Sequence, residues 1–178
     1  MTITRSNSDP LLTTARYVLG GAMGLCAFAT TMTAIGLGAV LTVQRQEMND
    51  KLALEGVADG GYLAVVAGML LIGALLALTF LFLRELFRIV GSVRMGDPFV
   101  PINADRLQRM AWMNLVIQFL LVAVASIAVW FRKMSTALLA EDALNLAVGA
   151  TLLTLVLFIL ARVFRVGAAM REELEGTI

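Results

Sequence analysis

The chain contains four long stretches without a single Asp, Glu, Lys or Arg, and these stretches constrain its fold more than any other feature. They are residues 17–44, 60–83, 110–131 and 143–161. A bilayer core of about 30 Å is crossed by roughly 20 apolar residues in a helix. A charge at the centre of such a helix opposes insertion by about 3 kcal/mol. The sequence therefore predicts an all-α polytopic membrane protein with four antiparallel transmembrane helices.

The composition favours one transmembrane domain over residues 1–178. Of the 178 residues, 60% are hydrophobic, and the mean hydropathy is +0.87. Soluble domains do not carry so much apolar sequence. Four spans and their connections use nearly the whole length, so no separate soluble domain is expected. A polar tail over residues 1–13 precedes the first span, the loop 84–109 joins the second span to the third, and a tail over residues 162–178 follows the fourth.

The positive charges predict the orientation of the spans. Ten of the 14 Lys and Arg residues lie in the N-terminal tail, the loop 84–109 and the tail 162–178, whereas the loops 45–59 and 132–142 hold four. Short cytoplasmic segments carry the excess of Lys and Arg in membrane proteins. Both termini and the loop 84–109 are therefore predicted to be cytoplasmic.

The connection between the second and third spans is predicted to be a helix, a sharp turn and a second helix. The second span is expected to continue as a helix until Gly91 and Gly96 weaken or cap it. The two prolines within residues 97–101 break the helix, because they lack an N–H donor and restrict the residues before them. Asn103 is then expected to be the N-cap of a helix that begins at Ala104.

Uncharged polar residues inside the spans have two interpretations. Asn114 and Gln118 lie four residues apart and so share a helix face, and Thr154 lies on the fourth span. They would line the path of a channel or transporter, or they would form interhelical hydrogen bonds worth about 0.6 kcal/mol each. Hydrogen bonding is favoured, and the absence of a carboxylate from every span argues against a proton-coupled pump.

Gly20 and Gly24 form a GxxxG pair, and weaker small-xxx-small pairs are formed by Ala64 with Gly68 and by Gly73 with Ala77. Such pairs permit the close approach of two helices. Contact within one chain is favoured over contact in a homo-oligomer, although both uses stay open.

The sequence predicts no catalytic, cofactor or metal site. It contains no histidine, and its one cysteine, Cys26, lies inside the first span. No nucleophile, base or metal-ligand cluster can be assembled from the remaining residues, so a non-enzymatic protein is expected. Carboxylates offset the arginines of the loop 84–109, which argues against direct nucleic-acid binding and favours attraction to the lipid bilayer.

Two motifs resemble those of the bacterial domain-of-unknown-function 2975 family. The first is Gly96-Asp97-Pro98-Phe99 followed by Asn103, Arg106 and Leu107. The second is Phe164-Arg165-Val166-Gly167 followed by Met170, Arg171, Glu172, Glu173, Thr177 and Ile178. The pair Glu175-Gly176 departs from the family pattern of an acidic residue followed by an apolar one. The resemblance implies a multi-pass protein of the bacterial inner membrane with no established enzymatic activity, often encoded beside a helix-turn-helix regulator of the Cro/C1 type.

That pairing suggests, by analogy, a membrane protein that binds and restrains a cytosolic helix-turn-helix transcription factor through its loop and tail. The predicted partner-binding residues are Asp97, Pro98, Phe99, Asn103, Arg106, Arg171, Glu172 and Glu173. Phe99 would be the apolar anchor, Asn103 and Arg106 would orient the loop or contact the partner, and residues 171–173 would form a second wall.

Two alternatives stand beside this interpretation. In the first, the same residues are purely structural: Asn103 caps a helix, Phe99 packs in an internal interface and Arg106 pairs with a carboxylate of the tail. In the second, the protein is a small oligomeric channel or transporter.

Overall fold

The computed structural model describes residues 10–42, 50, 61–95, 99–132 and 136–175. It contains four long helices, and no residue in these ranges belongs to a strand. The helices are α1 (Pro10–Thr42), α3 (Gly61–Arg94), α4 (Pro101–Arg132) and α5 (Thr136–Glu175). Each of the four is long and apolar enough to cross a membrane. The predicted all-α membrane fold is confirmed.

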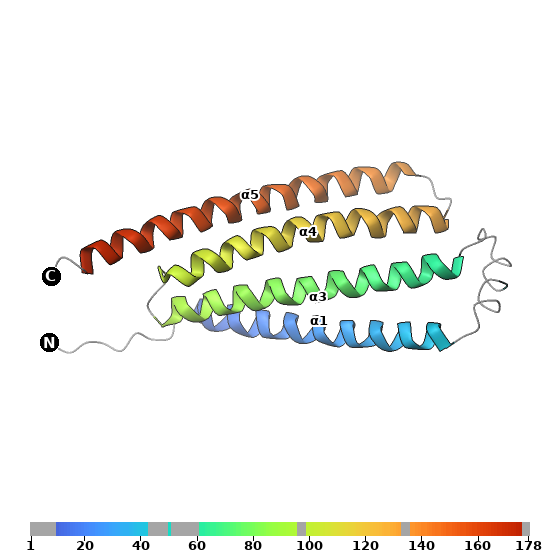
Figure 1. Cartoon of the computed structure of the whole chain (residues 1–178), viewed down its shortest axis with the longest axis horizontal. Helices are drawn as coiled ribbons and strands as arrows, with labels where there is room; N and C mark the ends of the chain where they lie inside the picture. Colours follow the sequence, from blue (N-terminus) through green and yellow to red (C-terminus); the bar gives the residue numbers. More distant parts are fainter. Residues whose placement is uncertain (1–9, 43–49, 51–60, 96–98, 133–135, 176–178) are drawn as a thin grey trace.

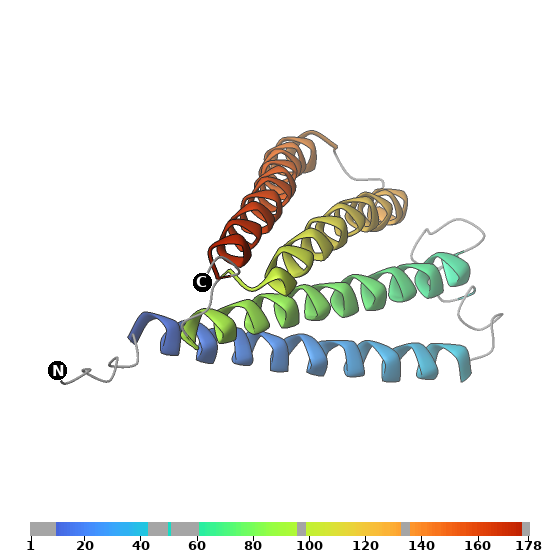
Figure 2. The same ribbon diagram turned by 60° about the vertical axis from the view of Figure 1, so that its left-hand side comes forward.

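The four helices run antiparallel in chain order, and both termini lie at the same end as the turn between α3 and α4 (Figure 1). Contacts between helices are concentrated in three pairs, α1 with α3, α3 with α4 and α4 with α5. The order of the helices in space is therefore their order in the sequence. Figure 2 shows the consequence: α1 and α5 lie at opposite edges of an open, curved layer instead of closing a four-helix bundle.

The buried core lies where α3, α4 and α5 converge, close to the end that holds the termini. Its residues are Ile89, Leu107, Met110, Ala111, Leu157 and Ala161. Trp112 and Phe158 extend it with an edge-to-face contact between α4 and α5, their ring centroids 5.5 Å apart. Elsewhere large apolar side chains such as Leu25, Phe119 and Leu152 are exposed, as expected for helices whose surroundings are lipid.

Three helix boundaries differ from the sequence-based expectation. α1 begins at Pro10, inside the expected polar tail, and proline suits the first position of a helix. α3 continues past Gly91 to Arg94, because its buried neighbours Ile89 and Ser92 stabilise the helix against a glycine cost of about 1 kcal/mol. α5 begins at Thr136, inside the expected loop 132–142.

The expectation that Asn103 is an N-cap is wrong. α4 begins at Pro101, so Asn103 lies within its first turn. The proline occupies the first helical position, where its missing N–H has no helical partner to lose. The backbone N–H of Asn103 donates to the Val100 carbonyl at 2.9 Å, and the side chain of Asn103 is left for another role.

The expectation that Gly20 and Gly24 permit close contact with another helix of the same chain is also wrong. A Cβ atom added at either position would meet nothing within 4 Å. The weaker pairs do lie at internal contacts: a Cβ at Gly68 would lie 3.9 Å from Ile127 Cγ2, and Gly73, together with Gly36, lies where α1 meets α3. A Cβ at Gly36 would lie 3.0 Å from the Met69 methyl carbon, and one at Gly73 would lie 3.8 Å from Thr33 Cγ2.

Candidate functional site

The charged ends of the helices form one region, which we call the arginine-rich end. It consists of residues 10–16 of α1, 84–94 of α3, 99–109 before and within α4, and 162–175 of α5. It includes all the predicted partner-binding residues that the structure describes. At about 1.5 Å per residue, α5 extends roughly 20 Å beyond its uncharged stretch, so the predicted tail is a continuation of a transmembrane helix.

Glu85 is the buried acidic centre of the arginine-rich end. Its side chain is 9% exposed and lies 3.3 Å from Arg88, 3.7 Å from Arg106 and 3.8 Å from Arg109. Arg88 and Arg109 are about half exposed, whereas the Arg106 side chain is 17% exposed. Pairs with exposed partners contribute little, so the Glu85–Arg106 pair is the one whose disruption would leave a buried charge uncompensated.

Asn103 connects α4 to α3 beside this ion pair. It is 0% exposed, and its Nδ2 donates to Ser92 Oγ at 2.7 Å. Ser92 Oγ in turn donates to the Ile89 carbonyl at 2.8 Å. Arg106 donates to Asn103 Oδ1 at 3.0 Å. A fully buried amide must be hydrogen-bonded to be tolerated. These hydrogen bonds therefore hold the first turn of α4 against the last turns of α3.

Phe99 connects the turn to α5. Its ring centroid lies 5.3 Å from that of Phe164. A Cβ atom added at Gly167 would lie 2.9 Å from Phe99 Cδ1, which is closer than carbon atoms approach one another. The ring therefore occupies the space that a side chain at residue 167 would take, and it remains 42% exposed.

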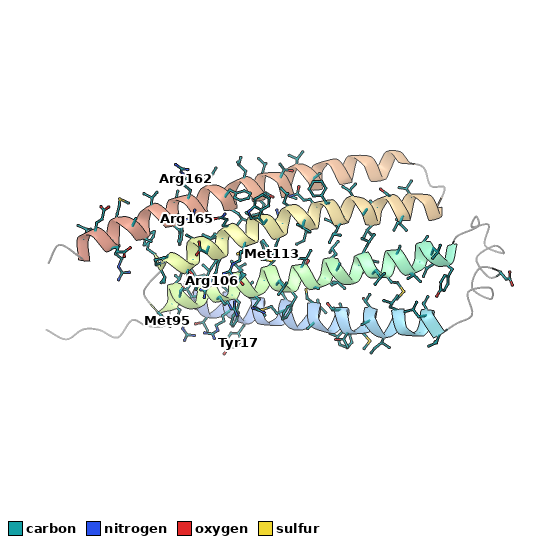
Figure 3. The ribbon with its side chains drawn as sticks, viewed as in Figure 1. Tyr17, Met95, Arg106, Met113, Arg162 and Arg165 are labelled. Carbon is teal, nitrogen blue, oxygen red and sulfur yellow. The ribbon has the colours of Figure 1, made fainter. Side chains whose placement is uncertain are left out.

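A polar contact joins α5 to α4 on the same end. Arg165, labelled in Figure 3, donates to Gln108 Oε1 at 2.7 Å and to Asp105 Oδ1 at 3.3 Å. Both members of the ion pair are more than half exposed, so it contributes at most about 1 kcal/mol. Together with Phe99, it shows that the loop 84–109 and the helical tail touch.

The structure divides the predicted partner-binding residues into two groups. Phe99, Asn103 and Arg106 take part in the packing just described, whereas residues 171–173 lie exposed on α5. Asp97 and Pro98 lie outside the described residues, as does Gly96. Arg106 pairs with Glu85 of α3, which differs from the expected tail carboxylate.

The sequence analysis gave no role to Glu85 or Ser92, and it named Gly167 only as part of the second motif, without the contact to Phe99. Glu85 could have been predicted most readily of the three, because it is the only acidic residue among the first arginines after the second span.

The polar residues of the spans pair with one another across α4 and α5. Asn114 Nδ2 and Gln118 Nε2 both donate to Thr154 Oγ1, at 2.8 and 2.9 Å, and to the Ala150 carbonyl, at 3.0 and 3.2 Å. Thr151 Oγ1 donates to Gln118 Oε1 at 3.2 Å. The favoured interpretation, interhelical hydrogen bonding, is confirmed.

Within the part of the chain that the structure describes, no group of three His, Cys, Asp or Glu side chains could hold a metal ion. At the arginine-rich end, Glu85 of α3 pairs with Arg106 and Arg109 of α4, and Asp105 of α4 pairs with Arg165 of α5. Cys26 is a free thiol within α1.

Four membrane-spanning helices with inert spans and a structured charged end define the class: a multi-pass membrane protein. A family model described as "Protein of unknown function (DUF2975)" matches residues 61–178, and the chain belongs to this family. The matched region holds α3, α4 and α5, while α1 precedes it. Comparisons with curated proteins and with solved structures find no match to this chain.

Proposed function

We propose that this chain is a non-enzymatic regulatory protein of the bacterial inner membrane, whose arginine-rich end faces the cytoplasm and binds a cytosolic helix-turn-helix transcription factor. The excess of Lys and Arg in the segments at this end supports the orientation, since such segments stay on the cytoplasmic side. The contrast between inert spans and a structured end supports a role in binding instead of transport.

The observation that carries the proposal is the exposed apolar surface on the part of α5 beyond its uncharged stretch. Leu174 is 72% exposed and Met170 is 55% exposed. Met170 lies three residues after Gly167, and Leu174 lies four residues after Met170, so both share the helix face on which Phe99 packs. Charged residues 171–173 lie beside them. An apolar centre with a polar rim is the usual composition of a protein-binding surface.

The structure suggests a distinct role for each predicted residue. Phe99, Met170 and Leu174 would contact the partner, and residues 171–173 would form the rim. Asn103 and Arg106 would act by orienting the turn between α3 and α4, because their polar groups are engaged inside the protein. Since α5 is one continuous helix from the membrane to Glu175, a displacement of its span would move the binding surface as a rigid unit.

The test is a crosslinked purification of the tagged full-length protein from its native membrane, with bound proteins identified by mass spectrometry. Leu174→Glu places a charge at the centre of the proposed surface. Leu11→Glu is the matched control, because Leu11 is 77% exposed at the same end but on α1, at the opposite edge of the layer (Figure 2). Recovery of a helix-turn-helix protein with the wild type and with Leu11→Glu, but not with Leu174→Glu, supports the proposal. Recovery of no such protein, or equal recovery with both variants, overturns it.

One feature supports the alternative of a small oligomeric channel or transporter. Gln118, Thr151 and Thr154 face a cavity of about 630 Å³ between α4 and α5. The rest of its lining is apolar, and the three polar side chains bond to one another, so the feature is weaker than the surface on α5. Cysteines placed at Gln118 and Thr151 would react with water-soluble reagents from both sides of the membrane if this alternative holds.

A further inference from the structure

A basic groove lies between the first turns of α1 and the last turns of α3, apart from the surface proposed for the protein partner. Its volume is about 490 Å³, and its lining includes Arg16, Tyr17, Gly20, Phe87 and Arg94. A second hollow of similar size shares Arg16, Phe87 and Arg94 with it and adds Arg88. Arg16 and Arg94 therefore line both hollows, and Arg88 lines the second.

Two of these arginines form no ion pair with another described residue. The ion pairs formed among the described residues involve Arg88, Arg106, Arg109 and Arg165, and neither Arg16 nor Arg94 takes part in them. Arg16 is held over the face of Phe87, with its guanidinium carbon 4.8 Å from the ring centroid. Such stacking fixes the cation in position and leaves its N–H donors free for an anion.

The groove holds a further unsatisfied polar group. Thr13 lines it, and Thr13 Oγ1 is buried without a hydrogen-bond partner among the described residues. A buried hydroxyl without a partner is uncommon in native proteins, and a bound ion is one of the explanations for it. An anion bound between Arg16 and Arg94 could accept a hydrogen bond from the Thr13 hydroxyl.

The charges that flank the spans indicate that the groove lies at the level of the lipid headgroups. Arg16 directly precedes the uncharged stretch of α1, and Arg84 directly follows that of α3. Tyr17 is 79% exposed, and tyrosine is enriched at the membrane–water interface. On the membrane side of the arginines, Gly20 and Gly21 line the groove, and a Cβ atom at either would meet nothing within 4 Å. That open space can accommodate a hydrocarbon chain.

We propose that this groove is a binding site for an anionic diacyl phospholipid. The phosphate accepts hydrogen bonds from Arg16 and Arg94, and one acyl chain lies along α1 beside Gly20 and Gly21. Basic pockets between transmembrane helices on the cytoplasmic side recognise lipid headgroups in this way. The site goes beyond the proposed function, since it involves neither α5 nor the turn between α3 and α4.

The test is native mass spectrometry of the purified full-length protein, titrated in detergent with phosphatidylglycerol and, separately, with phosphatidylcholine. We expect tighter binding of phosphatidylglycerol, and a loss of affinity of roughly tenfold or more in the double variant Arg16→Gln/Arg94→Gln. Arg162→Gln removes one positive charge, half the change made by the double variant, from an exposed position outside the groove and is expected to change the affinity less than twofold.

A second pair of variants tests the acyl-chain site without altering charge. Gly21→Leu fills the groove, whereas Gly24→Leu adds the same side chain at a position that is equally open but does not line it. Weaker phosphatidylglycerol binding with Gly21→Leu alone supports the proposal.

Three outcomes would overturn it: equal binding of both lipids, equal losses in Arg16→Gln/Arg94→Gln and Arg162→Gln, or complete displacement of phosphatidylglycerol by millimolar inorganic phosphate with no effect of Gly21→Leu. The last outcome would identify the groove as a site for free phosphate.

Discussion

The ring of Phe99 lies on Gly167, in the space where any other residue would place its Cβ atom. A Cβ at position 167 would be 2.9 Å from Phe99 Cδ1 and 3.1 Å from Cε1. This contact joins the turn between α3 and α4 to the helix that carries the proposed binding surface. Residues 68 positions apart in the chain thereby become one structural unit at the arginine-rich end.

The Phe99–Gly167 contact predicts the sign of two glycine substitutions. In a helix interior, Gly→Ala normally stabilises by about 0.5–1 kcal/mol. Gly91→Ala should show this gain, because a Cβ there meets nothing within 4 Å. Gly167→Ala should show none, and Gly167→Leu should destabilise by about 1–3 kcal/mol because it overfills the contact. Thermal unfolding of the purified variants in one detergent measures the difference, and an equal gain for both alanine variants would contradict the account.

The burial of the Glu85 carboxylate predicts that charge substitutions at Glu85 and at its arginine partners will have unequal effects on stability. Glu85→Gln leaves the partly buried Arg106 without a counter-ion and should destabilise by about 3–5 kcal/mol. Arg106→Gln should approach that loss, whereas Arg109→Gln should cost no more than about 1 kcal/mol because its side chain is more than half exposed. Glu172→Gln, on the exposed face of α5, is the control for loss of a carboxylate. Equal effects at Arg106 and Arg109 would show that the buried pair is not the stabilising one.

The hydrogen bonds between α4 and α5 predict a modest loss on removal of a single hydroxyl. Thr154→Val deletes the acceptor shared by Asn114 and Gln118 and should destabilise by about 0.6–1.7 kcal/mol, from the average to the largest value measured for such bonds in a membrane protein. Thr154→Ser keeps the hydroxyl and should be closer to the wild type. Unfolding in detergent again gives the comparison, and a Thr154→Ser variant as unstable as Thr154→Val would assign the effect to packing.

The charge bias predicts which helix ends react with reagents on each side of the membrane. In a Cys26→Ala background, Met95→Cys should be labelled from the cytoplasm, and Thr42→Cys, at the other end of α1, from the outside. Both positions are exposed. Labelling of intact cells with a membrane-impermeant maleimide should modify position 42 alone. Modification of position 95 instead would invert the topology and remove the basis for a cytosolic partner.

The sequence predicted those features that depend on local chemistry. The lack of charge in four stretches predicted the membrane fold, and the spacing of Asn114 and Gln118 placed two amides on one helix face, as observed. It did not predict the helix boundaries, because proline and glycine act differently according to their surroundings. Pro101 begins a helix instead of interrupting one, and buried neighbours carry α3 past Gly91.

The contacts that build the arginine-rich end were not predictable because they join distant residues. The ion pair between Glu85 and Arg106 depends on how α3 packs against α4. The pairing of Phe99 with Gly167 depends on the absence of a side chain at one position, and a glycine inside a helix has no distinctive pattern. The open layer likewise follows from packing between whole helices, since four apolar stretches are equally compatible with a closed bundle.

Site-specific photocrosslinking in living cells tests the central claim most directly. A photoreactive amino acid is placed at Met170 or Leu174 on the proposed surface, and at Phe119 or Leu152 on exposed faces of the spans. The account predicts that the first pair crosslinks to a cytosolic helix-turn-helix protein and that the second pair does not. If Met170 and Leu174 crosslink only to lipid or to a second copy of the chain, the arginine-rich end is not the binding surface proposed for it.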